Sequence, residues 1–199
     1  WLKYAPEDSL SLFMFQKPKT AKRLYFDIIP KTVDEYLTFA DKLKTETDPV
    51  KLLQNPAWHI HEGKAPEREI PLSFGILLNL VSVCNTNDPE LLWAFISRYA
   101  KGATPENAPY LDKLVGYAIN YYNDFVKPAK KYRAATDAEK AALTELRDML
   151  KTLDAGTNGG DIQTQVFEVG KNHNYENLRD WFKALYEILL GQEQGPRMG

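Results

Sequence analysis

Two histidines in the stretch "WHIHEG", His59 and His61, are the first residues in the sequence whose types and spacing suit a chemical role. Side chains two positions apart point to the same face of a strand, so two imidazoles at this spacing would suit a metal ion. A zinc site needs three or four ligands, and the chain offers only His173 and one cysteine besides these two. We therefore interpret both histidines as surface residues and predict no metal site.

Covalent catalysis has no good candidate in the sequence. The serines fall in predicted helices or helix caps, and no histidine is accompanied by residues that suggest an activated nucleophile. The glycine-rich stretch "GTNGG" does not lie between a strand and a helix, which indicates a flexible connector rather than a phosphate-binding loop. We expect this chain, taken alone, to be non-catalytic.

Three groups of polar and basic residues remain, and their chemistry suits RNA. Lysine and arginine pair with phosphates, a tyrosine ring stacks on a base, and amide or guanidinium groups bond the edges of unpaired bases. Ordinary solvated surface is the alternative for each group. The groups are Lys17, Lys19, Lys22 and Arg23; Lys127, Lys130, Lys131 and Arg133 around Tyr132; and Gln192, Gln194 and Arg197 at the end of the chain.

Helices must position these groups, because helical signals dominate the sequence. Apolar residues recur at spacings of three and four, and only residues 57–71 suggest a small hairpin or an extended excursion. The almost wholly apolar stretch "IPLSFGILLNLVSVCN" is expected at the centre of a bundle, and Trp93, Phe95 and Trp181 are expected in the core. Helix starts are predicted at Pro6, Thr32, Asp48-Pro49, Asp88-Pro89, Thr104-Pro105 and Thr136, where Glu139 completes a capping box. The fold class that follows is all-α.

The overall composition sets wider limits. With 25 basic and 27 acidic side chains among 199 residues, net charge predicts no nucleic-acid partner, although a local patch acts over about 8–10 Å. The single cysteine, Cys84, excludes an intramolecular disulfide and fits a reducing, cytoplasmic setting. No apolar stretch is long enough for a membrane span, and nothing resembles a signal peptide. The sequence begins at Trp1 as though inside a domain, so we expect a piece of a longer chain.

Three long blocks carry a resemblance to a known family. They are "LSLFMFQKPKTAKRLYFDIIPKTVDEYL", "LLWAFISRYAKGATPENAPYLDKLVGYAINYYNDFVKPAKKYR" and "LYEILLGQEQGPRMG". Together they resemble the C-terminal half of a class I lysyl-tRNA synthetase of the bacterial type. The resemblance covers essentially the whole chain and rests on ordered blocks rather than on one short motif.

The resemblance implies an activity and an architecture. Members of the family attach lysine to tRNA with ATP, in a Rossmann-type domain that carries the motifs "HIGH" and "KMSKS". Neither motif occurs here, so ATP and lysine would bind the absent catalytic domain, and this chain would need no cofactor of its own. The C-terminal half in the family is a helical bundle that leads into an α-helix cage, which grips the anticodon. Residues 1–70 would then be a stem-contact-like subdomain, and residues 71–199 the anticodon-binding cage, truncated at its C-terminus.

The resemblance also suggests roles for individual residues, with tRNA(Lys) and the chain's own catalytic domain as partners. The second group would meet phosphates through its lysines and Arg133, while Tyr132 stacks on a base. The third group would reach base edges or fix the turn, and the first would lie along the tRNA stem. Trp58 and His59 are further candidates for stacking. No role is assigned to residues 152–177.

Two other functions stay open at this point. In one, the chain is a helical protein–protein scaffold without an RNA role, and the basic groups are ordinary soluble surface. In the other, it is a metal-dependent enzyme built on His59 and His61, which would require bound metal in the purified protein.

Overall fold

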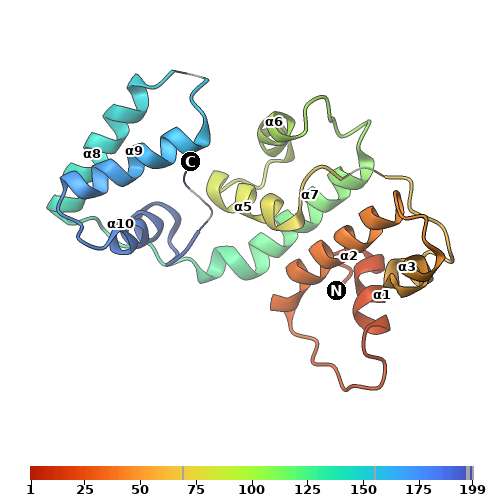
Figure 1. Cartoon of the computed structure of the whole chain (residues 1–199). Coiled ribbons are helices and arrows are strands. Elements are labelled where there is room, and N and C mark those ends of the chain that lie inside the picture. The colour runs from red at the N-terminus through yellow and green to blue at the C-terminus, as the bar shows by residue number, and fades with distance from the viewer. Residues whose placement is uncertain (69, 155, 196–197, 199) are drawn as a thin grey trace. The chain divides into compact units, whose positions relative to one another are not determined.

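The computed structural model describes residues 1–68, 70–154, 156–195 and 198, and within these ranges every regular element is a helix. The all-α prediction is thus confirmed for the described part of the chain. The α-helices are α1 (Glu7–Phe15), α2 (Ile29–Leu43), α3 (Pro49–Gln54), α4 (Pro56–Ile60), α5 (Phe74–Cys84), α6 (Pro89–Tyr99), α7 (Pro109–Tyr121), α8 (Asp137–Thr152), α9 (Gly159–Asn172) and α10 (Leu178–Leu185) (Figure 1). Shorter helical turns cover Phe26–Ile28, Tyr122–Val126, Lys127–Ala129 and Tyr186–Leu190. No helix in the described ranges is long and apolar enough to cross a membrane.

The chain folds into two compact units, residues 1–128 and residues 129–199. These differ from the predicted ranges, 1–70 and 71–199, because the predicted boundary falls inside the first unit. There the Asp34 carboxylate of α2 accepts the backbone N–H groups of Phe74 and Gly75, at 2.5 and 3.0 Å, and so joins α2 to the start of α5. The functional roles given to the two ranges remain predictions.

Helix α5 lies in the core of the first unit, as its apolar sequence predicts. Its residues Phe74, Leu77 and Val81 are buried and pack with apolar side chains of α2, α6 and α7. Trp93 on α6 is also buried, but Phe95 is 38% exposed, so the prediction that Phe95 lies in the core was wrong. Helix α6 buries the face that carries Leu92, Trp93 and Ile96, and Phe95 lies off that face.

Local capping explains most helix starts. The side chains of Asp48 and Asp88 each accept a backbone N–H two residues on, at 2.9 Å, and a proline follows each of them at the first helical position. The start predicted at Thr104-Pro105 was wrong, since α7 begins at Pro109. Thr104 and Asn107 instead exchange backbone-to-side-chain hydrogen bonds, at 2.8 and 3.3 Å, which hold this segment in a turn.

The small hairpin allowed for residues 57–71 does not form among the described residues. Asn55 accepts the N–H of Ala57 at 2.9 Å and starts α4, so Trp58 and His59 lie on a helix. The chain then turns through Glu62 and Gly63, both in the left-handed region. Helix capping at Asn55 therefore overrides the alternating pattern of the sequence.

The second unit packs α8, α9 and α10 around Trp181, which is fully buried as predicted. The Trp181 indole N–H donates to the carbonyl oxygen of Val166 at 2.9 Å. Gly170 lies against the indole, and a Cβ at this position would come within 2.6 Å of it. The ring is thus held by one hydrogen bond and by a close contact that only glycine allows.

Helix α8 begins with the predicted capping box, to which Arg133 adds an ion pair. Thr136 and Glu139 bond each other's backbone N–H groups, at 2.8 and 3.3 Å. The Arg133 guanidinium donates two hydrogen bonds to the Glu139 carboxylate, at 2.7 and 2.9 Å, and a third to Glu187 at 2.6 Å. Arg133 above all, together with the Thr136 hydrogen bonds, lowers the pKa of Glu139 to about 2, although burial opposes this shift.

We expect Arg133→Met to destabilise the second unit by about 1–3 kcal/mol at pH 7, because it leaves the Glu139 carboxylate without its main partner. Because the pKa of Glu139 is lowered on folding, its ionised form stabilises the folded state. This contribution is complete when the pH is above 4.5, the ordinary pKa of a glutamate, and is lost as the pH falls toward about 2. The difference between variant and wild type should therefore shrink across this window. Urea titrations followed by circular dichroism, at pH 7 and at about pH 2.5, measure this difference in the free energy of unfolding.

Arg147→Met is the matched control, since within the described ranges Arg147 forms its ion pair with the exposed Asp148 in the same unit. It should change the free energy of unfolding by no more than about 0.5 kcal/mol. Equal effects of the two variants, with no dependence on pH, would contradict the role given to Arg133.

Candidate nucleic-acid interface

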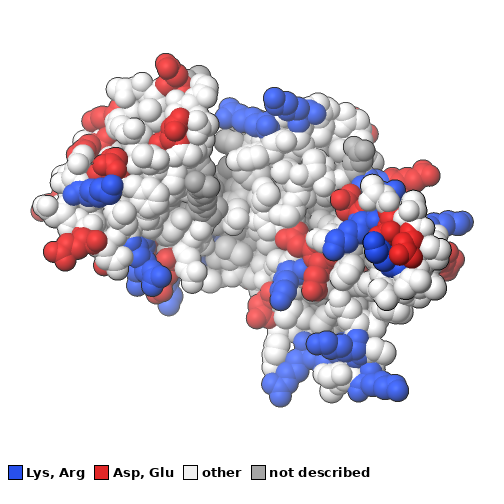
Figure 2. Space-filling model, in the orientation of Figure 1, with Lys and Arg blue, Asp and Glu red and all other residues white. Residues whose placement is uncertain are grey.

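The loop between α1 and α2, residues 16–25, forms a cationic patch on the first unit. Lys17, Lys19 and Arg23 are exposed, and the loop sequence contains no acidic residue. Figure 2 shows its cations gathered at the bottom of the view, without acidic side chains among them. This arrangement suits a phosphate backbone, because no acidic residue of the loop itself shields the three charges.

Lys22 of the same loop also has a structural role. Its ammonium group donates to the carbonyl oxygens of Phe13 and Met14, the latter at 2.7 Å, at the end of α1. Carbonyls in the last helical turn lack partners within the helix, and a cation there is favourable. Beside it, Tyr25 and Phe26 are about half exposed. The loop therefore offers aromatic surface as well as charge.

Trp58 and His59, the further stacking candidates, have partners within the first unit. The His59 ring stacks on Phe15 with centroids 5.2 Å apart, and its Nε2 lies 2.8 Å from the carbonyl oxygen of Leu53. Trp58 is half-buried and lies against Gly63. His61 hydrogen-bonds the Tyr36 hydroxyl at 2.9 Å. The described ranges contain no group of three or more histidine, cysteine or acidic side chains placed to hold a metal ion.

In the second unit the structure brings together two segments that lie far apart in the sequence. The backbone N–H of Lys131 donates to the carbonyl oxygen of Gly191 at 2.6 Å. Gly191 has a φ of +68°, and a Cβ there would lie 3.0 Å from two ring carbons of Tyr132. Glycine meets both demands, since it adopts this backbone conformation readily and lets the ring approach the chain. The second and third predicted groups thus meet at this contact.

A hollow of about 410 Å³ lies along this contact. Its walls include the Lys131 side chain, the Gln192 amide and the Arg133 guanidinium, which is held by its ion pairs with Glu139 and Glu187. Tyr132 is 53% exposed, and the ammonium group of Lys130 lies 6.0 Å from the centre of its ring. Burial lowers the pKa of Lys130 from its ordinary value. The other lining residues are Ala129, Glu187, Gly191 and Glu193.

The remaining predicted residues differ in position. Lys127 is exposed but belongs to the first unit, and Gln194 is exposed in the second. Arg197 lies outside the described residues. Arg133 faces two carboxylates of its own unit, so its described contacts position the chain.

A further set of residues in the second unit escaped the sequence analysis. Arg179, Phe182, Lys183 and Tyr186 line a neighbouring hollow of about 450 Å³, together with Glu193 and Gln194. Their spacing of three, four and seven positions from Arg179 places them on one side of α10 and of the turn that follows it. A search for cations and aromatic residues at helical spacing would have found them.

Comparisons with known proteins bear on both units. Residues 1–64 match the family described as tRNA synthetases class I (K). The whole chain aligns with the lysine–tRNA ligases of Rickettsia bellii strain OSU 85-389, at 52% identity, and of Rickettsia felis and Rickettsia conorii, each at 50%. The chain spans 38% of the length of each of these curated relatives. Two independent comparisons therefore agree on the relationship that the sequence blocks predict.

The agreement covers every residue of the chain in the curated relatives and the first third of it in the family profile. The chain belongs with the class I lysyl-tRNA synthetases and corresponds to part of one of them.

Proposed function

We propose that this chain is the region of a class I lysyl-tRNA synthetase that binds the anticodon arm of tRNA(Lys). The observation that carries the proposal is the contact between residues 130–133 and 191–192. It brings the exposed Tyr132 ring against Gly191, and Lys131, Gly191 and Gln192 line a hollow there. These are the groups with which proteins hold unpaired RNA bases and the phosphates beside them. The relatives' name, lysine–tRNA ligase, supports tRNA(Lys) as the RNA.

The residues at and beside this contact have distinct tasks in this proposal. Tyr132 stacks on an unpaired base, and Lys130 and Lys131 meet the adjoining phosphates. Gln192 addresses a base edge, because an amide carries both a donor and an acceptor. Arg133 is a positioning residue, since its guanidinium fixes the segment that carries Lys131 and Tyr132.

The cationic loop of the first unit, residues 16–25, then contacts the tRNA stem. Duplex RNA is recognised through its shape and its phosphates rather than through base edges, which suits exposed lysines and an arginine. Chemistry belongs to the rest of the enzyme, where ATP and lysine bind. Correct engagement of the anticodon arm would place the acceptor end of the tRNA in that catalytic site, which is a positioning effect.

The competing function is a helical scaffold for protein partners, in which the same cations are only surface. RNA binding should weaken steeply as salt rises, because bound phosphates release counterions. A hairpin with the lysine anticodon, compared with one whose central anticodon uridine is changed, tests recognition directly. Tight binding that the change abolishes supports the proposal, and no binding at low salt would refute it.

We expect Tyr132→Ala to weaken binding of the anticodon hairpin by about 1–3 kcal/mol, because it removes a stacking surface. Tyr132→Phe keeps the ring and should bind like the wild type. Fluorescence anisotropy with a labelled hairpin measures both. If the two variants lose affinity equally, the hydroxyl rather than the ring is responsible, and stacking by Tyr132 is excluded.

We expect the double variant Lys17→Gln, Lys19→Gln to reduce the salt dependence of tRNA(Lys) binding. The slope of log affinity against log salt should become shallower by roughly 1 for each phosphate contact that is lost. Binding measured between 50 and 200 mM salt gives this slope. The matched control is Lys44→Gln, Lys51→Gln, which removes two lysines of the same unit that pair with Asp41 and Glu46. Equal slopes for the two double variants would remove the loop from the interface.

A further inference from the structure

Helix α10 has two faces with different tasks. One face carries Trp181, Ala184 and Leu185, which are buried in the core of the second unit. The other side carries Arg179, Phe182 and Lys183, with Tyr186 one turn further on. Arg179 and Lys183 are exposed, while the two rings are partly buried. Phe182 also packs against the core of the second unit, and the side as a whole, with its cations and aromatic rings, lines a hollow.

The walls of this hollow suit a flat, polar ligand. Phe182 meets Phe167 edge to face, with centroids 5.1 Å apart, and this contact anchors its ring. The backbone of Gly195 lies against Tyr186, since a Cβ on Gly195 would come within 2.7 Å of that ring. Residues 193–195 therefore close the hollow on one side, where they add the carboxylate of Glu193 and the amide of Gln194. Its volume of about 450 Å³ falls in the range of small-ligand sites.

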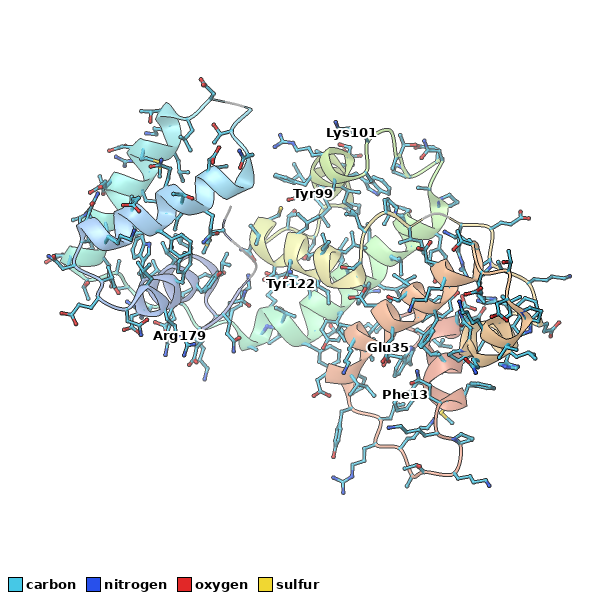
Figure 3. All side chains as sticks on the ribbon, viewed as in Figure 1. Phe13, Glu35, Tyr99, Lys101, Tyr122 and Arg179 are labelled. Carbon is cyan, nitrogen blue, oxygen red and sulfur yellow. The ribbon has the colours of Figure 1, made fainter. Side chains whose placement is uncertain are left out.

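Of the two cations that line the hollow, one forms ion pairs within the described ranges and the other does not. The Lys183 ammonium lies 3.5 Å from Glu187 and 4.0 Å from Glu193, so its charge is shared between two carboxylates. Arg179 joins no ion pair within the described ranges, and Figure 3 labels it on α10. A guanidinium without a carboxylate partner is well suited to a phosphate.

The hollow also adjoins the site already described. Glu193 lines both hollows, while Gln192 lines the first and Gln194 the second. The turn at residues 192–194 therefore separates two sites of similar chemistry, each with an aromatic ring nearby, a cation and an amide.

We propose that the hollow on α10 is a second nucleotide subsite, which holds one unpaired nucleotide next to the one at Tyr132. The base lies against Phe182, Gln194 bonds its edge, and Arg179 pairs with its phosphate. The Glu193 carboxylate accepts a hydrogen bond from a base amino or imino group, which lets the subsite discriminate between bases. This inference rests on the proposed function, because it requires that the second unit bind the anticodon loop.

The test uses anticodon hairpins with the fluorescent base 2-aminopurine placed at one loop position at a time, bound to the 199-residue chain. Stacking on an aromatic ring quenches the fluorescence of this base. We therefore expect the wild type to quench 2-aminopurine at one loop position, and Phe182→Leu not to quench it there. Arg179→Ala should weaken hairpin binding by about tenfold, since it removes a charged hydrogen-bond donor. Arg147→Ala, which removes an exposed arginine of the same unit, is the control and should bind like the wild type.

The possible results separate this inference from the proposed function. Quenching that Phe182→Leu abolishes, with a loss of affinity in Arg179→Ala alone, supports the subsite. If the wild type binds the hairpin, and Phe182→Leu and Arg179→Ala leave quenching and affinity as they are in Arg147→Ala, the subsite is overturned. The proposed function is then left intact. Absence of hairpin binding by the wild type overturns both, and would be the result if the hollow instead took a protein segment.

Discussion

The ion pair between Arg133 and Glu139 is the interaction on which the surface of the second unit depends. The same Glu139 carboxylate accepts the backbone N–H of Thr136 and two bonds from Arg133, so one side chain caps α8 and fixes the segment before it. The Arg133 guanidinium also donates to Glu187, which ties this segment to the helical turn Tyr186–Leu190. As a result, residues 130–133 follow a fixed path instead of sampling many. Such a segment would favour the proposed binding, because ordering a mobile segment at the moment of association opposes affinity.

Gly191 is the second constraint, and it works at closer range. Its left-handed conformation ends the helical turn Tyr186–Leu190, and its carbonyl oxygen accepts the N–H of Lys131. The missing side chain lets the Tyr132 ring lie against the backbone. One edge of the ring is therefore supported while half of the side chain stays open to solvent. A ring held in this way loses little rotational freedom on binding a base, which favours stacking.

How much of this the sequence predicts depends on the range of the interactions involved. Caps such as Asp48, Asp88 and the Thr136–Glu139 box act over two or three residues, so the pattern reveals them directly. The contacts that build the site act over longer separations. Arg133 and Glu187 are 54 positions apart, and nothing in "KPAKKYR" shows that this arginine has two carboxylate partners. The sequence therefore reveals the basic groups, but not which of their residues form internal ion pairs and which are exposed.

The errors have local causes that the apolar pattern does not reveal. Residues 57–60 alternate like a strand, yet the Asn55 cap makes them a helix that packs with α1 and α2. Phe95 has a core composition, but helix geometry turns it away from the buried face of α6. In each case the apolar pattern alone misled, and a helix cap or the helical repeat decided the outcome.

The net charge of −2 conceals two surfaces with different electrostatic character. The loop at residues 16–25 contains no acidic residue, and Figure 2 shows none among its cations on the face in view, so its positive field extends into solvent. The second unit interleaves its cations with Glu187 and Glu193, which shortens the range of their field. An unshielded patch accelerates encounter with any polyanion and carries little sequence information. A site of matched charges, amides and rings adds little at a distance but discriminates at contact. If both surfaces engage one tRNA, attraction and recognition are therefore separable properties, carried by different residues of the same chain.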